Sequence, residues 1–461
     1  MEKQSNDRGS FSKIGFILAA AGSSVGLGNL WKFPYLTGQN GGGIFVLVYL
    51  IMVVTIGFTC MLGETTIGKH TKLNPIGAYA KLSKKFAFVG VLGVLVPFLI
   101  VTYYNIIGGW ILKYIADFVM GKLAVMTSDP GKYFGGFITS PISPIFWTFV
   151  FVIINFVIIR AGVSEGIERM SKILMPALFV ILIVVVIRSV TLPGAAEGLV
   201  FYLKPDFSKL SMATVSAALG QVFFSLSLGM GAIVAYGSYL PDSTDVEKTS
   251  IIIPLMDTMA AILAGFAIFP ACAAFGIEVG AGPSLIFQTL PVVFNNMPGG
   301  VIWAIVFFFL VLFAAVTSST SLIECPVAWL IDNKGMERNK ATILVCVVAF
   351  LCAVPESLSL GALGGLTFPT LNGAMGIFDF VGYIAENVLL PASGFFMCIV
   401  IAKVWGIDNF EKAVTNNGEF SFRSKGFIEV MVKYIAPVLI FIIWLQSIGI
   451  WGLIKKALNI G

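Results

Sequence analysis

The sequence predicts an all-α integral membrane protein. Hydrophobic residues make up 57% of the 461 residues and charged residues only 11%, whereas about one-quarter of a soluble domain is charged. Eleven stretches are long and apolar enough for a membrane-spanning helix, which needs about 20 such residues. Two of these stretches, the first and the sixth, are interrupted by glycine and serine.

The predicted spans follow one another closely along the chain. In order, they are residues 13–36, 42–68, 87–120, 144–160, 170–190, 212–239, 251–276, 299–330, 340–354, 374–404 and 428–455. One further apolar segment, residues 283–297, is shorter and punctuated by proline. We therefore expect it to form a re-entrant or external hairpin that packs against the core.

Basic residues predict the orientation of the bundle. Cytoplasmic loops carry an excess of Lys and Arg, and most basic residues fall on one side if the N-terminus is cytoplasmic. These residues are Lys3, Arg8, Lys13, Lys69, Lys72, Lys81, Lys84, Lys85, Arg160, Arg169, Lys172, Lys334, Arg338, Lys340, Lys403, Lys412, Arg423 and Lys425. An odd number of spans places Lys455 and Lys456 outside, which is a mild departure from the rule.

The first interrupted stretch is "AGSSVGLGNLWKFP", residues 21–34. Gly22, Gly26 and Gly28 weaken the helix in the middle of a predicted span. Because an unpaired backbone group in hydrocarbon is costly, a break there has to face protein or line a water-filled site. The freed carbonyl groups are then able to bind a cation, and the freed N–H groups an anion.

The second interrupted stretch, residues 220–239, has the same character. Its mid-span residues are Ser225, Ser227, Gly229 and Gly231. It lies five spans after the first, which indicates an inverted repeat of two five-helix halves with a binding site at their interface. For one such stretch alone, close helix packing through small residues is the better explanation. Two stretches at matching positions favour a site.

This repeat defines the expected organisation of the chain, with one broken helix at the start of each half. The expected parts are a cytoplasmic N-terminal segment (1–12), the first inverted repeat with spans one to five (13–190), an extracellular loop (191–211), the second inverted repeat with spans six to ten (212–404), a cytoplasmic loop (405–427), and span eleven with a short extracellular C-terminus (428–461). The binding site is expected where the two repeats meet.

Composition and motifs exclude several other classes of protein. The net charge of +5 is spread between the spans, so it predicts orientation and not nucleic-acid binding. Six cysteines without a CxxC pair and a single histidine, His70, are too few for a metal centre of the zinc type. The stretch "GETTIGKH" (63–70) lacks the Ser or Thr of a phosphate-binding loop and follows a helix instead of a strand. No enzyme is therefore expected.

Five motifs occur in one order along the chain. They are "AGSSVGLGNLWKFPY" in span one, "NGGGIFVLVY" entering span two, "GIERMSKILMP" at span five, "FFSLSLGMG" in span six and "AAVTSSTS" in span eight. Together they resemble the neurotransmitter:sodium symporter family, and in particular its bacterial amino-acid transporters. The resemblance extends from about residue 8 to 455. Eleven spans, where many members have twelve, also resemble a bacterial subgroup.

The resemblance implies two Na⁺ sites. Sodium site 1 comprises the substrate carboxylate together with Ser24, Asn29, Ser225 and Asp257. Sodium site 2 comprises Gly22, Val25, Ala314, Thr317 and Ser318. Because the substrate completes site 1, the ion and the substrate are expected to raise each other's affinity. For the two span-eight hydroxyls of site 2, the alternative is hydrogen bonding back to the preceding turn.

Asp257 departs from the family pattern, since many relatives have Asn at this position. A carboxylate in mid-span costs about 2.5–3.5 kcal/mol, so it is expected to face a cation or to be protonated. Chloride-dependent relatives hold an anion near this site. We expect Asp257 to supply that negative charge and to make transport chloride-independent, with a pH-dependent role as the alternative. Glu324 and Glu386 are further candidates for buried carboxylates, without an assigned role.

The resemblance also implies a substrate site between the broken helices. Its residues are Ser24, Gly26, Leu27, Gly28, Ile100, Tyr104, Phe224, Ser225, Ser227, Met230, Ser318 and Leu322. N–H groups near Leu27 and Gly28 and the Tyr104 hydroxyl are expected to hold the substrate carboxylate. Gly26, where monoamine carriers have Asp, indicates a zwitterionic substrate. Met230 is deformable and favours a large hydrophobic or aromatic side chain. Taken singly, the apolar members equally suit core packing.

An outer gate is implied by position. Lys32 and Asp379 are expected to pair above the substrate, with Tyr104 and Phe224 as a lid. Relatives often have Arg in place of Lys32. Because lysine lacks the bidentate fork of arginine, we expect this gate to be weaker or bridged by water.

An inner gate and a structural support are implied in the same way. Arg8, Asp332 and Tyr239 are expected to close the cytoplasmic path. The stretch Gly166–Pro176 is expected to unwind and admit water to sodium site 2. Glu64, also in mid-membrane, is expected to bond the broken backbone of spans one and six as a support and not as an ion ligand.

The expected function is Na⁺-coupled uptake of hydrophobic, large or aromatic amino acids by alternating access. The expected partners are the amino acid and the lipid bilayer, without nucleic acid, and the expected location is the inner (plasma) membrane, which the chain crosses several times. A channel is disfavoured, because channels need weak, multi-ion sites, whereas a deep, gated site with an aromatic lid is implied. The alternative is a non-transporting regulatory or sensor protein of the same fold.

Overall fold

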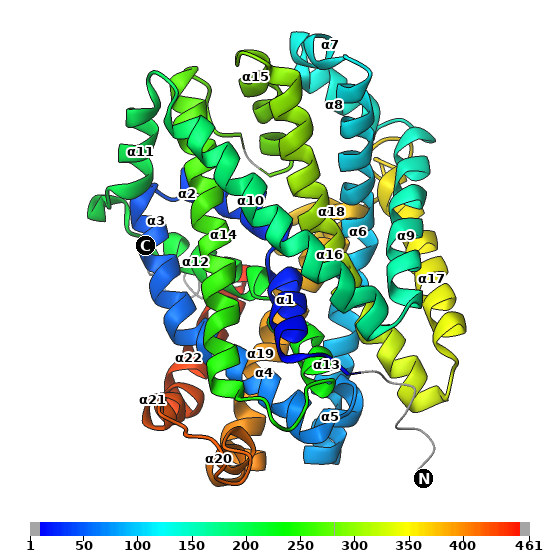
Figure 1. Ribbon diagram of the computed structural model, residues 1–461, viewed down its shortest axis with the longest axis vertical. Coiled ribbons are helices and arrows are strands. Elements are labelled where there is room, and N and C mark those ends of the chain that lie inside the picture. Colours follow the sequence, from blue (N-terminus) through cyan, green and yellow to red (C-terminus); the bar gives the residue numbers. More distant parts are fainter. Residues whose placement is uncertain (1–9, 281, 452–461) are drawn as a thin grey trace.

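The computed structural model describes residues 10–280 and 282–451, which form a bundle of helices (Figure 1). Within these residues, nine helical spans are long and apolar enough to cross a membrane: Gly43–Thr71, Lys84–Val119, Ser143–Arg160, Val163–Val190, Val246–Ala274, Gly300–Lys334, Arg338–Leu358, Ile377–Trp405 and Lys425–Ser447. The prediction of an all-α membrane protein is confirmed.

Many spans are built from successive helical segments. The α-helices are α1 (Lys13–Ser24), α2 (Phe33–Gln39), α3 (Gly43–Met52), α4 (Phe58–Thr71), α5 (Pro75–Leu82), α6 (Ala87–Val119), α7 (Leu123–Ser128), α8 (Pro130–Ile138), α9 (Ser143–Arg160), α10 (Arg169–Val190), α11 (Ala195–Leu203), α12 (Met212–Ser225), α13 (Ala232–Ser238), α14 (Val246–Ala274), α15 (Leu290–Asn295), α16 (Gly300–Lys334), α17 (Arg338–Leu358), α18 (Ile377–Gly382), α19 (Leu390–Ile399), α20 (Ile407–Val414), α21 (Lys425–Val430) and α22 (Ala436–Ser447). Wider π-helical segments are η1 (Gly28–Lys32), η2 (Val53–Gly57), η4 (Val163–Glu168), η6 (Leu285–Thr289), η7 (Tyr383–Leu389), η8 (Val400–Trp405) and η9 (Met431–Ile435), and short 3-10 turns are η3 (Lys84–Phe86) and η5 (Phe207–Lys209).

The first and sixth predicted spans are the discontinuous ones. The segments Lys13–Ser24 and Gly28–Gln39 are bent by 47° relative to each other. In the sixth span, α12 and α13 are separate short helices with a non-helical link between them. With the nine long helices, these two broken helices correspond to the eleven predicted spans.

Two segments refine the predicted boundaries. The tenth predicted span was placed from residue 374, but residues 367–376 form a hairpin of β1 (Thr367–Thr370) and β2 (Gly373–Gly376), and the helix begins at Ile377. The strands were not predicted because the segment is short and lacks an alternating apolar pattern. The segment 283–297 forms η6 and α15, which lie beside α7 and α8 at one end of the bundle (Figure 1).

Local sequence sets several helix ends. The Asp245 side chain caps α14 by accepting a hydrogen bond from the Lys248 N–H at 3.1 Å, which satisfies one of the free donors of a helix start. Gly299 (φ 72°) precedes α16, and Gly335 (φ 64°) follows it. Both backbones are left-handed, which glycine adopts without a steric cost.

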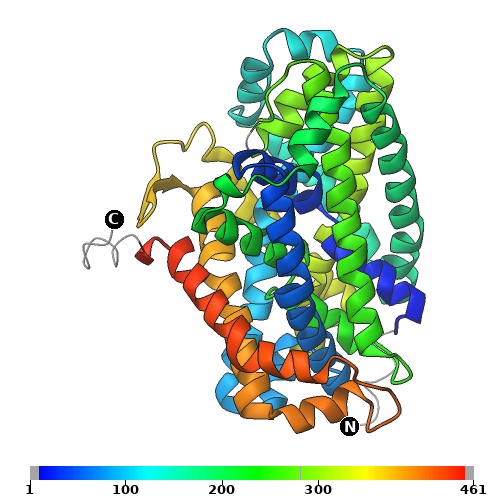
Figure 2. The same cartoon turned by 90° about the vertical axis from the view of Figure 1, so that its left-hand side faces the viewer.

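The broken helices lie inside the bundle. α1 packs against α10, α14 and α16, and α13 packs against α4 and α16. All seven residues of α13 are buried. Figure 2 shows the opposite arrangement for α22, which slants along the outer surface. The discontinuous backbone is therefore shielded from lipid, as its free polar groups require.

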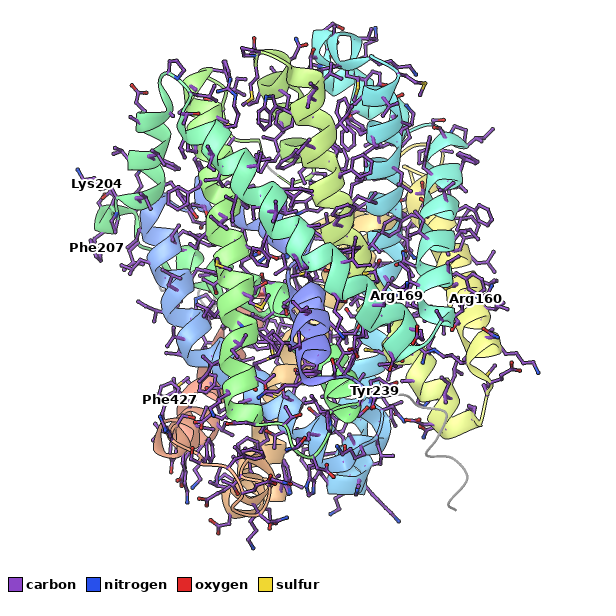
Figure 3. All side chains as sticks on the ribbon, viewed as in Figure 1. Arg160, Arg169, Lys204, Phe207, Tyr239 and Phe427 are labelled. Carbon is purple, nitrogen blue, oxygen red and sulfur yellow. The ribbon has the colours of Figure 1, made fainter. Side chains whose placement is uncertain are left out.

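Large apolar side chains cover the outer surface (Figure 3). Those on α9, α10 and α17 include Phe146, Val157, Ile173, Val180, Ile187, Val347 and Leu351, all exposed. Water-exposed apolar patches of this extent are unusual in soluble proteins. The surface is that of a protein solvated by lipid tails.

Candidate functional site

The first helix break exposes backbone groups to side chains from elsewhere. α1 ends at Ser24, and Val25 is extended (φ −72°, ψ 92°). The Gly26 N–H then donates to Asn29 Oδ1 at 2.9 Å. The Leu27 N–H donates to the Tyr104 hydroxyl, on α6, at 3.2 Å. Two N–H groups that a continuous helix would use are thus directed to the site.

The second break is longer. Residues 226–231 separate α12 from α13, and within them Ser227, Gly229 and Gly231 have positive φ angles of 54°, 73° and 67°. The Gly229 N–H donates to Glu64 Oε1 at 2.6 Å. Glu64 thus bonds the broken backbone of the sixth span, as was expected of it. Its second carboxylate oxygen, Oε2, has no hydrogen-bond partner among the described residues.

The two breaks enclose a small cavity of about 20 Å³, which is room for about one water molecule. It is lined by Ser23, Ser24, Gly26, Leu27, Gly28, Ile100, Tyr104, Phe224, Ser227, Met230, Ser318 and Leu322. Eleven of the twelve residues expected at a substrate site are therefore brought together, and Ser225 is the exception. The cavity as it stands is smaller than any amino acid.

Gly26 controls the shape of this cavity. A Cβ atom at this position would lie 2.4 Å from the Ser318 Oγ and 3.0 Å from the Tyr104 hydroxyl. Both distances are shorter than ordinary van der Waals contact. Any side chain at Gly26 would therefore fill the space between span one and span eight.

A buried carboxylate lies beside the cavity. Asp257 on α14 is fully buried, and its carboxylate accepts hydrogen bonds from Asn29 Nδ2 at 2.8 Å, Ser225 Oγ at 2.9 Å and the Tyr49 hydroxyl at 3.2 Å. All these donors are neutral. Among the described residues, no ion pair includes Asp257.

The residues expected at sodium site 1 suit a hard cation. The Ser24 Oγ is buried without a hydrogen-bond partner among the described residues, so it has an oxygen to offer. A buried carboxylate without a cationic side chain also favours a positive ion. Ser225 does not line the substrate cavity, but its hydroxyl is within hydrogen-bond distance of both carboxylate oxygens of Asp257. Ser24, Asn29, Ser225 and Asp257 therefore fit the ion that was expected there.

The residues expected at sodium site 2 lie at the contact of α1 with α16. The Ser318 Oγ donates to the carbonyl oxygens of Ser23 at 3.1 Å and Gly22 at 3.3 Å. The Thr317 hydroxyl instead bonds back to the Phe313 carbonyl at 3.0 Å and the Ala314 carbonyl at 3.1 Å. Thr317 thus bonds back to the preceding turn, which was the stated alternative to binding an ion. Ser318 instead connects α16 to α1.

Val25, the remaining member of that set, also lies at the first break. Its N–H donates to the Ala21 carbonyl at 2.6 Å and closes the last turn of α1. Its own carbonyl belongs to the unwound segment, where the helical hydrogen-bond pattern has ended.

The outer gate differs from the expected pair. The Lys32 Nζ lies 2.5 Å from Glu386 Oε2, so the predicted partner Asp379 is wrong for this structure. Glu386 Oε1 also accepts a hydrogen bond from the Tyr103 hydroxyl at 2.7 Å. The Lys32 Nζ lies 4.0 Å from the ring centroid of Phe224, which is within cation–π range.

A wide vestibule of about 530 Å³ lies above this gate. Asp379 lines it without an ion pair among the described residues. Leu27, Tyr104 and Phe224 line both the vestibule and the small cavity. These side chains therefore separate the two spaces, as a lid does.

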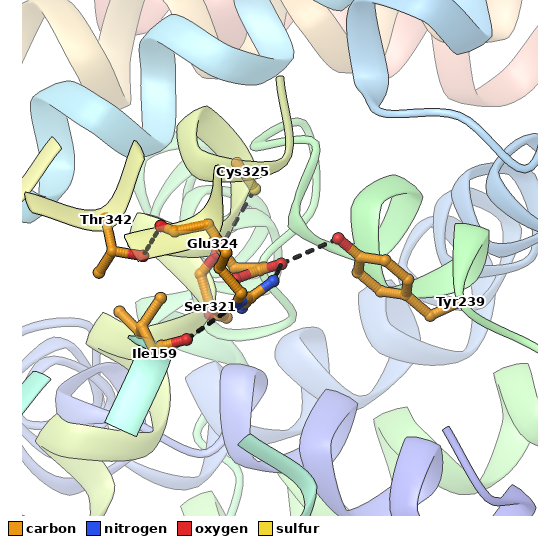
Figure 4. A network of polar contacts seen from close by, with 7 residues as sticks. Ile159, Tyr239, Ser321, Glu324, Cys325 and Thr342 are labelled. Carbon is orange, nitrogen blue, oxygen red and sulfur yellow. Dashed lines mark hydrogen bonds and ion pairs between the residues drawn. The ribbon is translucent and has the colours of Figure 1, made fainter. Parts of the chain in front are cut away.

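A largely buried network of polar contacts joins the end of α13 to α16 and α17 (Figure 4). Arg338 NH2 and NH1 donate to Glu324 Oε2 at 2.6 Å and Oε1 at 3.2 Å, and the Tyr239 hydroxyl donates to Oε1 at 2.8 Å. Arg338 Nε also donates to the Ile159 carbonyl at 2.9 Å. The residues expected at the inner gate included Tyr239 but neither Arg338 nor Glu324.

The other expected inner-gate residues lie nearby or outside the described part. Asp332 Oδ2 accepts hydrogen bonds from the Asn74 side chain at 2.8 Å and its N–H at 3.1 Å. Arg8 lies outside the described residues. Gly166 belongs to the π-helical segment η4, and α10 continues through Pro176, so span five is wound here.

Comparison with known proteins places this geometry in a family. A model of the Sodium:neurotransmitter symporter family matches residues 8–129 and 140–454. The protein belongs to this family. It is 38% identical over 454 residues to an uncharacterized sodium-dependent transporter of Haemophilus influenzae, an alignment that covers 95% of this chain and 97% of that protein. It is 36% identical over 450 residues to a Bacillus subtilis protein described in the same words, with 95% and 97% coverage.

A solved structure supports the same conclusion. The crystal structure of MhsT in complex with L-phenylalanine aligns with a TM-score of 0.88 and 40% identity, over 95% of this chain and all of that chain. Members of this symporter family are transporters and not enzymes, and the bacterial relatives are sodium-dependent. The chain is thus a multi-pass membrane transporter that uses Na⁺.

Several residues that contact the candidate site were not found from the sequence. Ser23 lines the cavity, and the Gln221 side chain donates to the Gly28 carbonyl at 2.8 Å and supports the first break. Tyr49 and Arg338 contact the carboxylates of Asp257 and Glu324. For Ser23, Gln221 and Tyr49, a polar residue within an apolar span is the signal that was available, whereas Arg338 lies between two predicted spans and gives no such signal.

Proposed function

We propose that this symporter couples uptake of hydrophobic, large or aromatic amino acids to Na⁺ influx by alternating access. The observation that carries the proposal is the cavity between the two broken helices, with its convergent polar groups. A relative of 40% identity, MhsT, is described in complex with L-phenylalanine. An apolar wall with a few directed polar groups is typical of sites for small molecules.

The substrate carboxylate would lie at the first break. The N–H groups of Leu27 and Gly28 and the Tyr104 hydroxyl are the donors for it. Gly26 leaves room for the zwitterion, because a side chain there would collide with Ser318 Oγ. Met230, which is flexible, would shift with Phe224 to widen the cavity around a large side chain.

Sodium would be transported at two sites. At site 1, the substrate carboxylate joins the Asp257 group as a ligand, which makes ion and substrate binding mutually dependent. At site 2, Thr317 would leave its own turn and join Ser318 and the span-one carbonyl groups. The fixed charge of Asp257 would take the place of a bound anion, so transport would be independent of chloride.

The orientation follows from the basic loops. We propose that the N-terminus and the loops that carry most of the Lys and Arg residues are cytoplasmic. The vestibule above Lys32 is then extracellular, and the Arg338–Glu324 network closes the cytoplasmic path. The membrane would be the inner (plasma) membrane of the cell.

The proposal is tested by uptake of labelled L-phenylalanine into proteoliposomes. Uptake should require an inward Na⁺ gradient and should persist when chloride is replaced by gluconate. Uptake without Na⁺ would contradict symport. Phenylalanine binding without uptake would instead identify the protein as a regulatory or sensor member of the fold.

Two variants sharpen this test. Gly26→Ala should lower uptake about tenfold, because overpacking by one methyl group costs on the order of 1–3 kcal/mol. Gly135→Ala is the matched control, since a Cβ atom there meets nothing within 4 Å. Asp257→Asn should lose more uptake in gluconate than in chloride, and equal loss in both would contradict the role proposed for its charge.

A further inference from the structure

A second polar cavity, of about 450 Å³, lies at the end of the bundle that carries α20 (Figure 1). It shares no lining residue with the substrate cavity. Its lining consists of Lys69, His70, Lys72, Asp242, Trp405, Asn409, Lys412, Ala413, Asn416 and Asn417. The cavity therefore joins the end of α4, the loop after α13 and the segment around α20.

The ionisable lining is predominantly positive. Three lysines against one aspartate give a charge of 3 − 1 = +2 with His70 neutral. Lys72 pairs with Asp242 at 2.9 Å. Lys412 is exposed and makes no ion pair with any residue that the structure describes. The lining residues by themselves are thus net positive, and the carboxylates of Asp245 and Glu419, outside the lining, lie close enough to Lys69 to act on its charge.

Two of the lysines are held in place. The Lys69 side chain is almost fully buried, and its Nζ donates to the Thr244 carbonyl at 2.7 Å. Lys72, whose φ of 57° is left-handed, ends α4, and its Nζ donates to the Leu240 carbonyl. An ammonium group that is already positioned loses little side-chain entropy when a ligand binds.

Neutral donors complete the lining. Asn416 and Asn417 both have positive φ angles, 51° and 58°, and lie in one tight turn, where the Asn416 amide already donates to the Glu419 carboxylate. Asn409 already donates to the Trp405 carbonyl at 2.8 Å. Ammonium and amide N–H groups around a polar space are the donors that phosphate oxygens accept from.

We propose that this cavity binds a phosphate-bearing anion, supplied as free phosphate or as the headgroup of an anionic phospholipid. Lys69 and His70 end the stretch "GETTIGKH" and lie in the last turn of α4. A phosphate would therefore meet these residues at a helix C-terminus and not in a phosphate-binding loop. A bound anion would compete with Asp242 for Lys72.

A simpler account is that the lysines offset the negative ends of α4 and α20, as cations near helix C-termini do. That account needs no ligand and no cavity. It covers Lys412 as well, which lies in the last turn of α20, but it does not account for the polar cavity of about 450 Å³ that the lysines line.

The test uses the full-length transporter in detergent. Equilibrium dialysis against ³²P-labelled inorganic phosphate measures the free anion, and native mass spectrometry measures retention of phosphatidylglycerol against phosphatidylcholine. Lys412→Gln should weaken binding of the anion about fivefold, as loss of one nearby charge does. Lys403→Gln is the matched control, because Lys403 is exposed on η8 but lies outside the cavity lining.

The outcomes separate the two sources. Saturable phosphate binding that weakens only in Lys412→Gln supports a free-phosphate site. Selective phosphatidylglycerol retention with the same dependence, without phosphate binding, supports a headgroup site. Failure to bind either probe, or equal binding by both variants with unchanged unfolding temperature, overturns the proposal. None of these results depends on whether the amino-acid substrate has been identified correctly.

Discussion

The two ion pairs proposed as the outer and inner gates differ in their surroundings. At the outer end, the side chains of Lys32 and Glu386 are 19% and 23% exposed and lie beside the vestibule of about 530 Å³. At the inner end, Glu324 is fully buried and accepts bonds from both Arg338 and Tyr239. Because Arg338 is 17% exposed, the two pairs differ in the burial of the carboxylate and not in that of the cation.

This difference has an energetic consequence. A partly exposed Lys–Glu pair contributes about 0–1 kcal/mol, since water screens it and it loses side-chain entropy. Removal of one partner from a buried pair leaves an uncompensated charge and costs about 3–5 kcal/mol. We therefore expect the outer gate to open easily, whereas the inner gate holds the bundle together until the cycle requires its release.

The largest effect is expected from Glu324→Ala. It leaves the Arg338 guanidinium, 17% exposed, without its carboxylate partner, so the free energy of unfolding should fall by about 3 kcal/mol, the lower end of the range for a buried pair. Thermal unfolding of the purified protein in detergent measures this loss. Glu337→Ala is the control, because Glu337 is exposed and its contact with Lys340 is long, at 3.5 Å. Equal loss in both variants would show that the inner pair is no stronger than a surface pair.

A smaller effect is expected from Arg338→Lys. Lysine keeps the charge near Glu324 but cannot make the two parallel bonds or the bond to the Ile159 carbonyl. Stability should therefore fall by about 1.5–3 kcal/mol, the value of a hydrogen bond to a charged group. The same unfolding experiment measures it. Wild-type stability in this variant would mean that charge alone closes the inner end.

Glu386→Gln is expected to change kinetics more than stability. Glutamine still accepts the bond from Tyr103 but no longer pairs with Lys32, so unfolding should change by less than about 1 kcal/mol. Dissociation of bound L-phenylalanine into the outer solution should be about fivefold faster, as measured by scintillation proximity. Unchanged dissociation would show that Phe224 and Tyr104 alone hold the outer side.

The smallest effect is expected from Asp379→Asn. Asp379 lines the vestibule, but Lys32 pairs with Glu386 in this structure. Neither unfolding nor dissociation of L-phenylalanine should change beyond the error of the Glu386→Gln experiment. If Asp379→Asn accelerates dissociation as much as Glu386→Gln, then Lys32 exchanges partners during the cycle and the outer gate has two closed forms.

The error at the outer gate shows a limit of sequence reasoning. Asp379 and Glu386 are seven residues apart, which is about two turns of one helix. Both therefore lie on one helix face, and spacing does not choose between them. The intervening π-helical segment η7 shifts the later residues around the axis, and that shift is a packing outcome. Arg338 was missed for a related reason, since many basic residues occur at the same membrane side.

The broken helices, in contrast, could be predicted. Glycine in the middle of an apolar span is unfavourable in a helix, and lipid does not tolerate the free backbone groups that result. Two such stretches, at 21–34 and 220–239, are sufficient to indicate a site, whatever the rest of the bundle does. The structure has its breaks at Val25–Leu27 and at 226–231, inside these ranges.

The sequence by itself determined the membrane class, the order of the spans and the two interruptions, because these depend on local composition and on the intolerance of hydrocarbon for unpaired polar groups. Only the tertiary structure decided which carboxylate meets Lys32, that Arg338 pairs with Glu324, and that Asp257 is surrounded by neutral donors alone. Those outcomes depend on where helices distant in sequence meet, which local composition does not determine.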